Sequence, residues 1–186
     1  EYMWCGDKKY WGRTSPVLFP FVGAPKNKEY RYDGKTYTMG QHGFARDMEF
    51  TLEAQTEENI SFVLTDTAET CEKYPFHFAL HIGYELCKNE VKVNWTVENT
   101  DTKELYFSIG AHPAFNCPVH GEENKTGYGL KFGGLADTIH HHGNTPDGMA
   151  VMEDKVLALK DGCVTFTEGF FDECTYMVAV SYTHLR

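Results

Sequence analysis

The segment that decides the fold is Phe76–Leu86, which reads Phe-His-Phe-Ala-Leu-His-Ile-Gly-Tyr-Glu-Leu. Every second residue, beginning with Phe76, is large and apolar, and the residues between them are polar or small. Side chains alternate between the two faces of a β-strand, so this period of two is typical of a strand with one buried face. We therefore expect one long strand here, with its apolar face on a core.

The residues that follow continue the pattern as an antiparallel meander. Lys88-Asn89 marks a turn, and residues 91–97 alternate again, with valine and tryptophan on one face. A second turn is expected at Asn99-Thr100-Asp101, and Leu105–Ile109 is expected to be a third strand.

Other segments also favour strands over helices. Asp33-Gly34 is a strong tight-turn dipeptide, and Ala68–Tyr74, which stops before Pro75, is the one helix that we expect. Regularly spaced strands with little helix predict an all-β fold, an antiparallel β-sandwich. The further expected strands are Glu29–Tyr32, Thr36–Met39, Phe50–Ala54, Ile60–Leu64, Val156–Leu159 and Val164–Thr167, the last two around Asp161-Gly162.

Bulk composition excludes several classes of partner. The 186 residues suffice for one sizeable domain, and the net charge of −10 argues against nucleic acid and against an anionic membrane surface. No apolar run approaches the about 20 residues that span a bilayer. The six cysteines form no C-x-x-C pair, so we expect reduced thiols in a cytoplasmic protein, without a zinc site. The run His140–His142 could suggest a metal, but the neighbouring Gly143 and Pro146 favour a polar loop.

Three segments are not explained by alternation. In Arg13–Gly23 two prolines bracket an apolar run, which predicts a rigid, buried, extended segment. Gln41–Asp47 and Gly110–Asn116 are loops that follow strands and carry His42 and His112. A single loop histidine is usually a surface residue or a hydrogen-bonding partner. Two of them at strand ends favour a shared binding site, since binding residues concentrate in loops on a rigid scaffold.

The same three segments resemble the motifs of one family. Tyr10–Pro20 resembles the N-terminal signature of the LacX-like bacterial branch of the aldose 1-epimerases, within the galactose mutarotase-like superfamily. Gln41–Asp47 is similar to its HGFAR motif, and Tyr106–Asn116 is similar to its G-x-H-P-x-F motif. The resemblance runs from about the start of the chain to near Val180. It implies a single domain, 1–180, with a galactose mutarotase-like supersandwich fold.

The chain also departs from the family pattern. Ala24-Pro25-Lys26 stands where the family usually has an arginine. The family's first strand and its C-terminal E-P-W-like segment, which carries the catalytic Glu, are both missing, so we expect an incomplete sandwich. Residues 181–186 resemble nothing in the family and are expected to be a foreign or disordered tail.

The resemblance implies an isomerase that interconverts the α and β anomers of a free hexose by acid/base ring opening and closure. His112 would be the general acid, a role that suits an imidazole with its pKa near neutrality. His42 would be a second catalytic histidine that bonds the sugar near the ring oxygen. Arg46 and Asp172 would bind the substrate. The alternative role of Arg46 is an ion pair with Asp47 or Glu49, and that of Asp172 is a structural role in a turn at a strand end. No metal or other cofactor is implied, and without the general-base Glu the fragment itself should be impaired.

Two other functions stay open. One is a hexose-6-phosphate 1-epimerase of the same fold, with Arg46 directed at the phosphate. A phosphate site normally recruits several basic groups, and only Arg13, Lys26 and Arg46 lie near the motifs. The other is a non-catalytic carbohydrate-binding β-sandwich.

Overall fold

The structure is a computed structural model that describes residues 2–119, 121, 124–133, 137–143, 145, 149, 151, 153, 155–172 and 176–178. The chain divides into two compact units. Unit 1 consists of Glu1–Pro16 with His112–Arg186, and unit 2 is Val17–Ala111. Residues 181–186 lie outside the described residues, and the single domain 1–180 stays a prediction.

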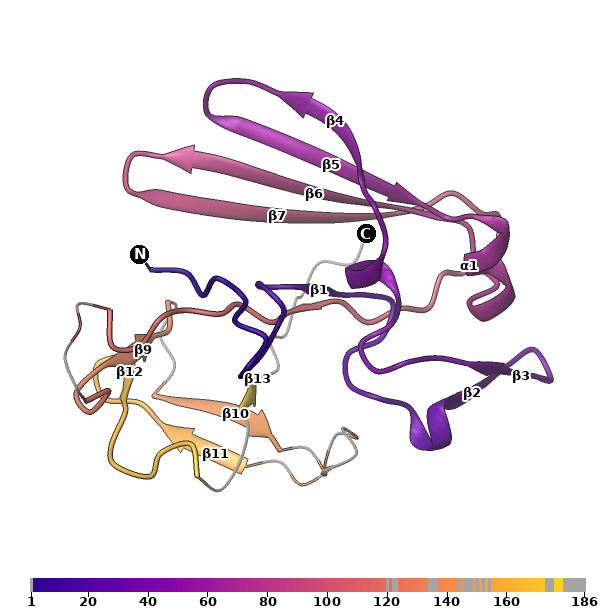
Figure 1. Ribbon diagram of the computed structural model, residues 1–186. Coiled ribbons are helices and arrows are strands. Elements are labelled where there is room, and N and C mark those ends of the chain that lie inside the picture. The colour runs from indigo at the N-terminus through magenta and orange to yellow at the C-terminus, as the bar shows by residue number, and fades with distance from the viewer. Residues whose placement is uncertain are drawn as a thin grey trace. The chain divides into compact units, whose positions relative to one another are not determined.

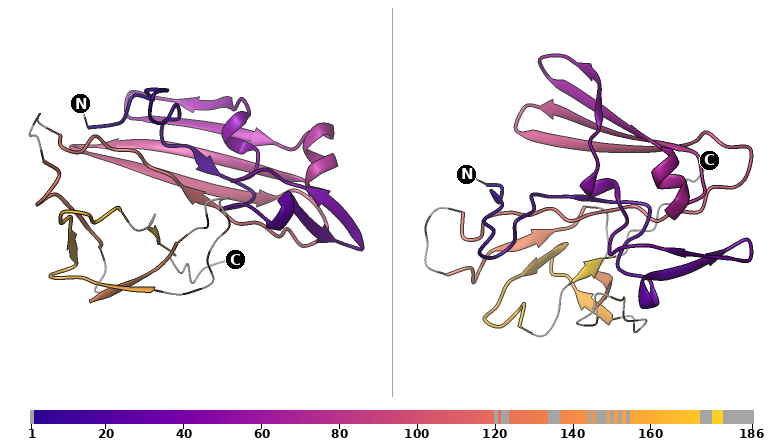
Figure 2. Two further views of the ribbon diagram at one scale, coloured as in Figure 1. Left: turned by 60° about the horizontal axis from the view of Figure 1, so that its bottom comes forward. Right: turned by 45° about the vertical axis from the view of Figure 1, so that its right-hand side comes forward.

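Unit 2 is built around a four-stranded antiparallel sheet (Figure 1). Its strands, in order across the sheet, are β4 (Thr51–Gln55), β5 (Asn59–Thr65), β6 (Phe78–Cys87) and β7 (Glu90–Asn99). The alternating segment at residues 76–86 is thus confirmed as a long strand, and Figure 2 shows it beside β7 along its length. The hairpin turns at Lys88, whose φ is 59°.

The other elements of unit 2 are short. β2 (Glu29–Tyr32) and β3 (Lys35–Thr38) form the predicted hairpin, with positive φ at Asp33 and Gly34 as a tight turn requires. α1 (Ala68–Lys73) confirms the expected helix, and its first turn is closed by a reciprocal capping box between Thr67 and Thr70. β1 (Val17–Leu18) pairs with β8 (Gly110–Ala111). Two 3-10 turns, η1 (Lys26–Lys28) and η2 (Ala45–Asp47), lie between these strands in the sequence.

The core of unit 2 is aromatic. Phe19 and Phe78 are completely buried, and their ring centroids lie 5.0 Å apart. Tyr74 and Phe76 join them, with centroids 4.7 Å apart. This packing confirms the middle of the Pro-bracketed segment 13–23 as extended and buried, since Val17–Leu18 is a strand and Leu18, Phe19 and Pro20 are buried. Aromatic rings bury much area each and so dominate such a core.

Burial falls along the β6–β7 hairpin. Leu80 is completely buried, whereas Leu86, on the same face near the turn, is 54% exposed. Its cross-strand partner Val91 is 61% exposed. The apolar face of the sheet is therefore covered at the end near α1 and uncovered at the tip of the hairpin.

The predicted third strand of the meander is wrong. Leu105–Ile109 forms no ladder with β7, and Ser108 N–H instead donates to the carbonyl of Pro20 at 2.8 Å. Leu105, Phe107 and Ile109 still pack against the core. The alternation therefore indicated correctly which face of Leu105–Ile109 packs on the core. Its backbone partner, however, is the segment after β1 and not β7.

Unit 1 contains two small antiparallel sheets among its described residues. β9 (Gly129–Lys131) pairs with β12 (Cys163–Thr165). β10 (Thr138–His142) lies between β11 (Lys155–Ala158) and β13 (Met177–Val178). The two strands expected around Asp161-Gly162 are present, but they belong to different sheets.

The expectation of a polar loop at residues 140–142 is also wrong. These residues form the end of β10, and His141 is only 5% exposed. Its ring packs on Tyr176 with centroids 4.7 Å apart. The exposure of the three histidine side chains therefore alternates as in a strand, and the middle imidazole is buried against an aromatic ring.

Taken together, the structure confirms an almost entirely β fold built of antiparallel sheets. In the part of the chain that the structure describes, no helix has the length and apolar character needed to cross a membrane. Cys5, Cys71, Cys87, Cys117 and Cys163 are free thiols.

Candidate functional site

The loop Gln41–Asp47 is clamped to the core of unit 2 through Gly43. Gly43 forms a parallel bridge with Phe19, and its φ is 70°. A Cβ atom at this position would lie 2.2 Å from the Phe19 carbonyl oxygen, so only glycine fits. The same oxygen accepts from the N–H groups of Phe44 and Ala45, each at 3.1 Å. The motif is thereby fixed to a completely buried residue.

His42 is held by both its backbone and its ring. Its N–H donates to the carbonyl of Gly23 at 2.7 Å, and its Nδ1 accepts from the N–H of Gly23 at 3.0 Å. A nitrogen that accepts carries no proton, so the neutral ring has its proton on Nε2. His42 also adopts φ 65°, an uncommon backbone conformation for a residue with a side chain. The loop therefore presents His42 as a hydrogen-bond donor through Nε2.

Arg46 lies on η2 in the same loop and is largely buried. Its Nη2 donates to the carbonyl of Gln41 at 2.8 Å, and its Nε lies 3.7 Å from the Asp47 carboxylate. The ion pair with Asp47, one of the two roles weighed from the sequence, is therefore present. The guanidinium also closes the loop that carries His42, and its contact with a substrate stays a prediction.

His112, in unit 1, is exposed and braced by the N-terminal segment. Its N–H donates to the carbonyl of Pro16 at 3.1 Å, and its ring lies on that of Trp11 with centroids 4.7 Å apart. Trp11 is itself fixed, since its carbonyl accepts from Trp4 Nε1 at 2.9 Å. The contact of Trp11 with His112 was not foreseen, although Trp11 stands in the N-terminal signature motif. Nothing in the spacing of the sequence could show that the two rings are in contact.

The residues after His112 are tied to the start of the chain. Ala114 N–H donates to Ser15 Oγ at 3.1 Å, and its carbonyl accepts from Trp4 N–H at 3.1 Å. Asn116 bonds the carbonyls of Tyr2 and Met3 with its backbone and side-chain amides. Two segments far apart in sequence thus form one ladder-like support for His112.

Asp172 lies in an exposed turn of unit 1. Its N–H donates to the carbonyl of Gly169 at 2.9 Å, and the same turn carries Phe170 and Phe171, whose rings pack on that of Phe166. The turn role weighed from the sequence is therefore present, and the substrate role stays a prediction. Glu173, the neighbouring carboxylate, lies outside the described residues.

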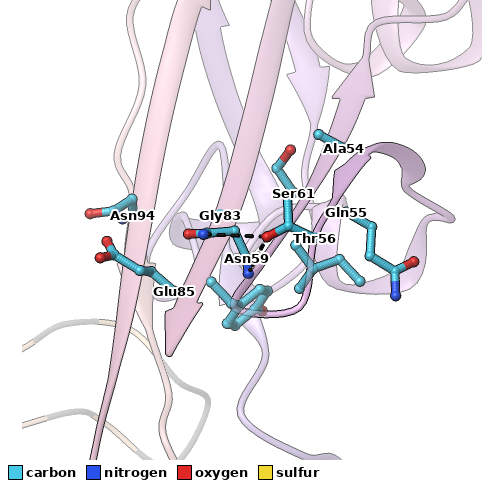
Figure 3. A pocket seen from close by; sticks show the side chains of 10 residues that line it. Ala54, Gln55, Thr56, Asn59, Ser61, Gly83, Glu85 and Asn94 are labelled. Carbon is cyan, nitrogen blue, oxygen red and sulfur yellow. Dashed lines mark hydrogen bonds between the residues drawn. The ribbon is translucent and has the colours of Figure 1, made fainter. Parts of the chain in front are cut away.

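His42 and Arg46 belong to unit 2, whereas His112 and Asp172 belong to unit 1. A common pocket for them stays a prediction. Within unit 2, a shallow hollow of about 120 Å³ lies on the four-stranded sheet, lined by Ser61, Gly83 and Asn94 among others (Figure 3). Ligand pockets usually measure about 300–1,000 Å³. None of the four predicted site residues lines this hollow, and it is too small for a hexose site.

Comparisons with known proteins point to one family. Residues 1–155 match the family model for aldose 1-epimerase. The chain is 37% identical over 138 residues to the chromosomal and plasmid LacX proteins of Lactococcus lactis subsp. lactis. That match covers 71% of this chain and 46% of each relative, so the chain spans about half the length of these curated relatives.

Solved structures of galactose mutarotase-like proteins are also similar to this chain. A galactose mutarotase related enzyme from Lactobacillus acidophilus has a TM-score of 0.84 at 35% identity, over 97% of this chain and 60% of its own. A galactose mutarotase-like protein from Lactobacillus casei has a TM-score of 0.82 at 32% identity, over 96% of this chain and 61% of its own.

Proposed function

Because this chain belongs to the aldose 1-epimerase family, we propose that it carries the general acid and part of the sugar site of an enzyme that interconverts hexose anomers. The substrate would be a free hexose, bound without a metal or other cofactor. The observation that supports this most directly is the hold on His42, whose backbone N–H and ring Nδ1 both bond Gly23, so that the ring has a fixed orientation. We also propose that the protein works in the cytoplasm, with its cysteines reduced.

The proposed reaction moves two protons. A base takes the proton from O1, the bond between C1 and the ring oxygen breaks, and His112 gives its proton to the ring oxygen. Rotation about C1–C2 exposes the other face of the aldehyde, and the reverse steps close the ring. His42 donates to the sugar near the ring oxygen, and Arg46 and Asp172 bond the hydroxyls. The base would be the Glu of the family's E-P-W-like segment, which these 186 residues do not contain.

Two features of His112 support its role as the acid. Its side chain is exposed, so a sugar can reach it, and the imidazole packs against the Trp11 ring at an angle of 34°. A group that transfers protons in either direction must be held in position without being buried away from the substrate. The contact with Trp11 meets that condition.

The contacts of Arg46 support the alternative function, a hexose-6-phosphate 1-epimerase, less well. Its guanidinium already bonds the Gln41 carbonyl and lies beside the Asp47 carboxylate, so much of its charge is matched. A free hexose needs only hydrogen bonds from this group. The non-catalytic alternative predicts sugar binding without anomer exchange.

The test is polarimetry on freshly dissolved α-glucose and α-galactose, with a parent protein that includes the E-P-W-like segment. His112→Ala should lower the rate by about 10²–10⁴-fold, as loss of a general acid typically does. His140→Ala, an exposed histidine of the same unit, is the matched control and should leave the rate unchanged. A His112→Ala enzyme within a few-fold of the parent would refute the assignment. Faster exchange of a hexose 6-phosphate would favour the phosphate alternative, and bound sugar without exchange would favour the non-catalytic one.

A further inference from the structure

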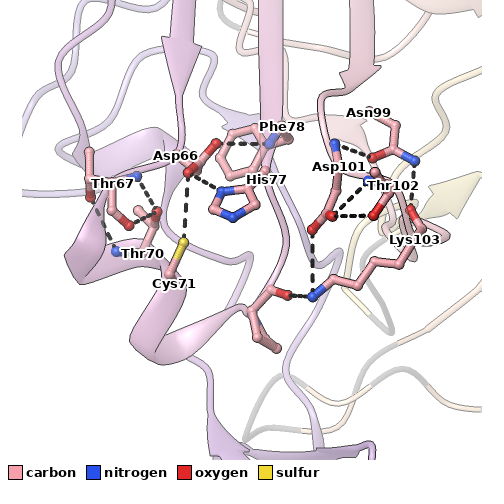
Figure 4. Close-up of polar contacts among 11 residues, drawn as sticks. Asp66, Thr67, Thr70, Cys71, His77, Phe78, Asn99, Asp101, Thr102 and Lys103 are labelled. Carbon is pink, nitrogen blue, oxygen red and sulfur yellow. Dashed lines mark hydrogen bonds and ion pairs between the residues drawn. The ribbon is translucent and has the colours of Figure 1, made fainter.

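Three side chains of unit 2, apart from the loops described above, bring different ligand atoms together. Asp66 follows β5, Cys71 lies in α1, and His77 precedes β6 (Figure 4). A carboxylate oxygen, the sulfur and a ring nitrogen of these residues all lie within 4.8 Å of one another. In the described residues this is the one such group of three. It plays no part in the sugar chemistry proposed above.

The backbone fixes these three residues before any ligand binds. Asp66 N–H donates to the Phe78 carbonyl at 3.2 Å, and Phe78 N–H donates to Asp66 Oδ1 at 3.0 Å. The capping box of Thr67 and Thr70 sets the start of α1, so the position of Cys71 is fixed by the first turn. Only Asp66 Oδ2 remains directed toward the other two side chains.

Hydrogen bonds connect the three side chains. Asp66 Oδ2 lies 2.7 Å from His77 Nδ1 and 3.7 Å from Cys71 Sγ, and both groups can donate to it. The hydrogen bond to Asp66 raises the pKa of His77, and burial together with Asp66 raises the pKa of the Cys71 thiol. Burial alone would raise the pKa of Asp66, but the hydrogen bonds from His77 and Phe78 together with the charge of His77 lower it.

We propose that Asp66, Cys71 and His77 form a binding site for a divalent cation of the zinc class, with water as the fourth ligand. One oxygen, one nitrogen and one sulfur are all common zinc ligands. With bonds of about 2.0–2.3 Å, tetrahedral ligand atoms lie roughly 3.4 Å apart. The contact of 3.7 Å between Oδ2 and Sγ is close to this spacing, and the contact of 2.7 Å to His77 must open by a fraction of an ångström. Cys71 Sγ and His77 Nδ1 lie within 4.8 Å of each other, so small side-chain rotations bring all three atoms to the ion.

Binding exchanges protons for the ion. Coordination removes the thiol proton of Cys71, which is released to solvent, and leaves His77 as a neutral imidazole that binds through Nδ1 and carries its proton on Nε2. A carboxylate, a thiolate and a neutral imidazole then balance the two positive charges of the ion. The ammonium of Lys103 is directed elsewhere, because it bonds the Pro75 carbonyl at 2.6 Å and lies 3.6 Å from the Asp101 carboxylate. Asp66 and Cys71 are half-buried and His77 is exposed, so an ion has an open path.

The test is titration of the chelator-treated full chain with Co²⁺, whose bond to a thiolate gives a charge-transfer absorption band. The wild type should show a saturable band at one ion per chain, and competition with Zn²⁺ should abolish it. Cys71→Ser should remove the band. His77→Asn and Asp66→Asn should weaken affinity by at least the about 10–100-fold that loss of a mere second-shell partner costs. Cys87→Ser, a half-buried thiol at the end of β6, is the matched control and should retain the band.

The outcomes separate clearly. No saturable band in the wild type, or a band of full strength in Cys71→Ser, would overturn the site. His77→Asn alters only an exposed side chain, so unchanged affinity in this variant would overturn it even if Cys71→Ser failed to fold. Since the readout is absorption and not anomer exchange, the result is independent of the proposed enzyme activity.

Discussion

The two units hold their functional loops by different means. In unit 2, the loop of His42 is attached to Phe19, which lies in a core of completely or almost completely buried aromatic rings. In unit 1, His112 is held by backbone hydrogen bonds to the N-terminal segment and by one ring contact with Trp11. The buried apolar residues described in unit 1 are fewer, namely Leu159, Val164 and Phe166, and none is below 7% exposure. A core thus positions one histidine, and hydrogen bonds between distant segments position the other.

The largest expected effect tests this difference directly. Phe78→Ala should lower the free energy of unfolding of unit 2 by about 3–5 kcal/mol, because it leaves a cavity among packed rings. Phe166→Ala in unit 1 should cost less, since Phe166 is 8% exposed and its site can relax. Denaturant titration, monitored by amide hydrogen exchange in each unit, would measure the loss of unfolding free energy for both variants. Equal losses for the two variants would remove the contrast between the units.

Gly43→Ala should have the next largest effect. The new Cβ would meet the Phe19 carbonyl at 2.2 Å, in a backbone conformation with φ 70°. We expect a loss of about 1–3 kcal/mol and a displaced His42. Gly34→Ala is the control, because Gly34 has a similar φ of 72° but no atom within 4 Å of the added Cβ. It should cost about 1 kcal/mol from backbone strain alone. Thermal unfolding of the two variants compares them, and equal costs would show that the clamp on Phe19 is unimportant.

Trp11→Ala should have a moderate effect on catalysis in the parent enzyme. An aromatic pair is worth about 0.5–1.5 kcal/mol, so loss of the ring beneath His112 should lower kcat about three- to tenfold. KM should change little, because the ring positions the acid and does not bind the sugar. Tyr10→Ala, which removes a neighbouring ring that is 72% exposed, should have no effect. If both variants behaved alike, the brace on His112 would have no role in proton transfer.

The smallest expected effect concerns the Tyr30 hydroxyl at the edge of the unit 2 core. Burial raises its pKa from 10.0 to about 12, and the hydroxyl donates to the Lys73 carbonyl at 2.7 Å. A raised folded-state pKa gives stability that is complete below pH 10 and is lost as pH rises toward 12. Tyr30→Phe should therefore make the unfolding free energy less dependent on pH in this range. Unchanged pH dependence would mean that Tyr30 ionises as freely in the folded protein as in the unfolded one.

How far the sequence predicted the structure depended on the range of the interaction. Hairpins such as the one at Asp33-Gly34, and the helix before Pro75, follow from local turn chemistry and were correct. Leu105–Ile109 has a strand-like alternation, yet its backbone partner is Pro20, which lies far earlier in the chain. Alternation encodes which side is buried and not which neighbour covers it.

The candidate site shows the same limit. The histidines could be selected from their motifs, because the residue types and order are local features. The left-handed φ of His42, the acceptor role of its Nδ1 and the ring contact between Trp11 and His112 all depend on distant segments. A buried imidazole such as His141 was likewise hidden within a polar triplet, since only the packing on Tyr176 distinguishes it from its neighbours.

The short ladder between β1 and β8 has a consequence for how the chain could be rearranged. Val17 is paired with Ala111, so the first and last residues of unit 2 leave it side by side. A segment whose two ends meet can be joined by a short linker, opened elsewhere, or moved into another host chain without stretching its interior. Residues 17–111 are therefore a segment suited to transfer or circular permutation. A circular permutant opened at the exposed Lys88-Asn89 turn would keep every strand of the sheet, but β6 and β7 would then lie at opposite ends of the chain.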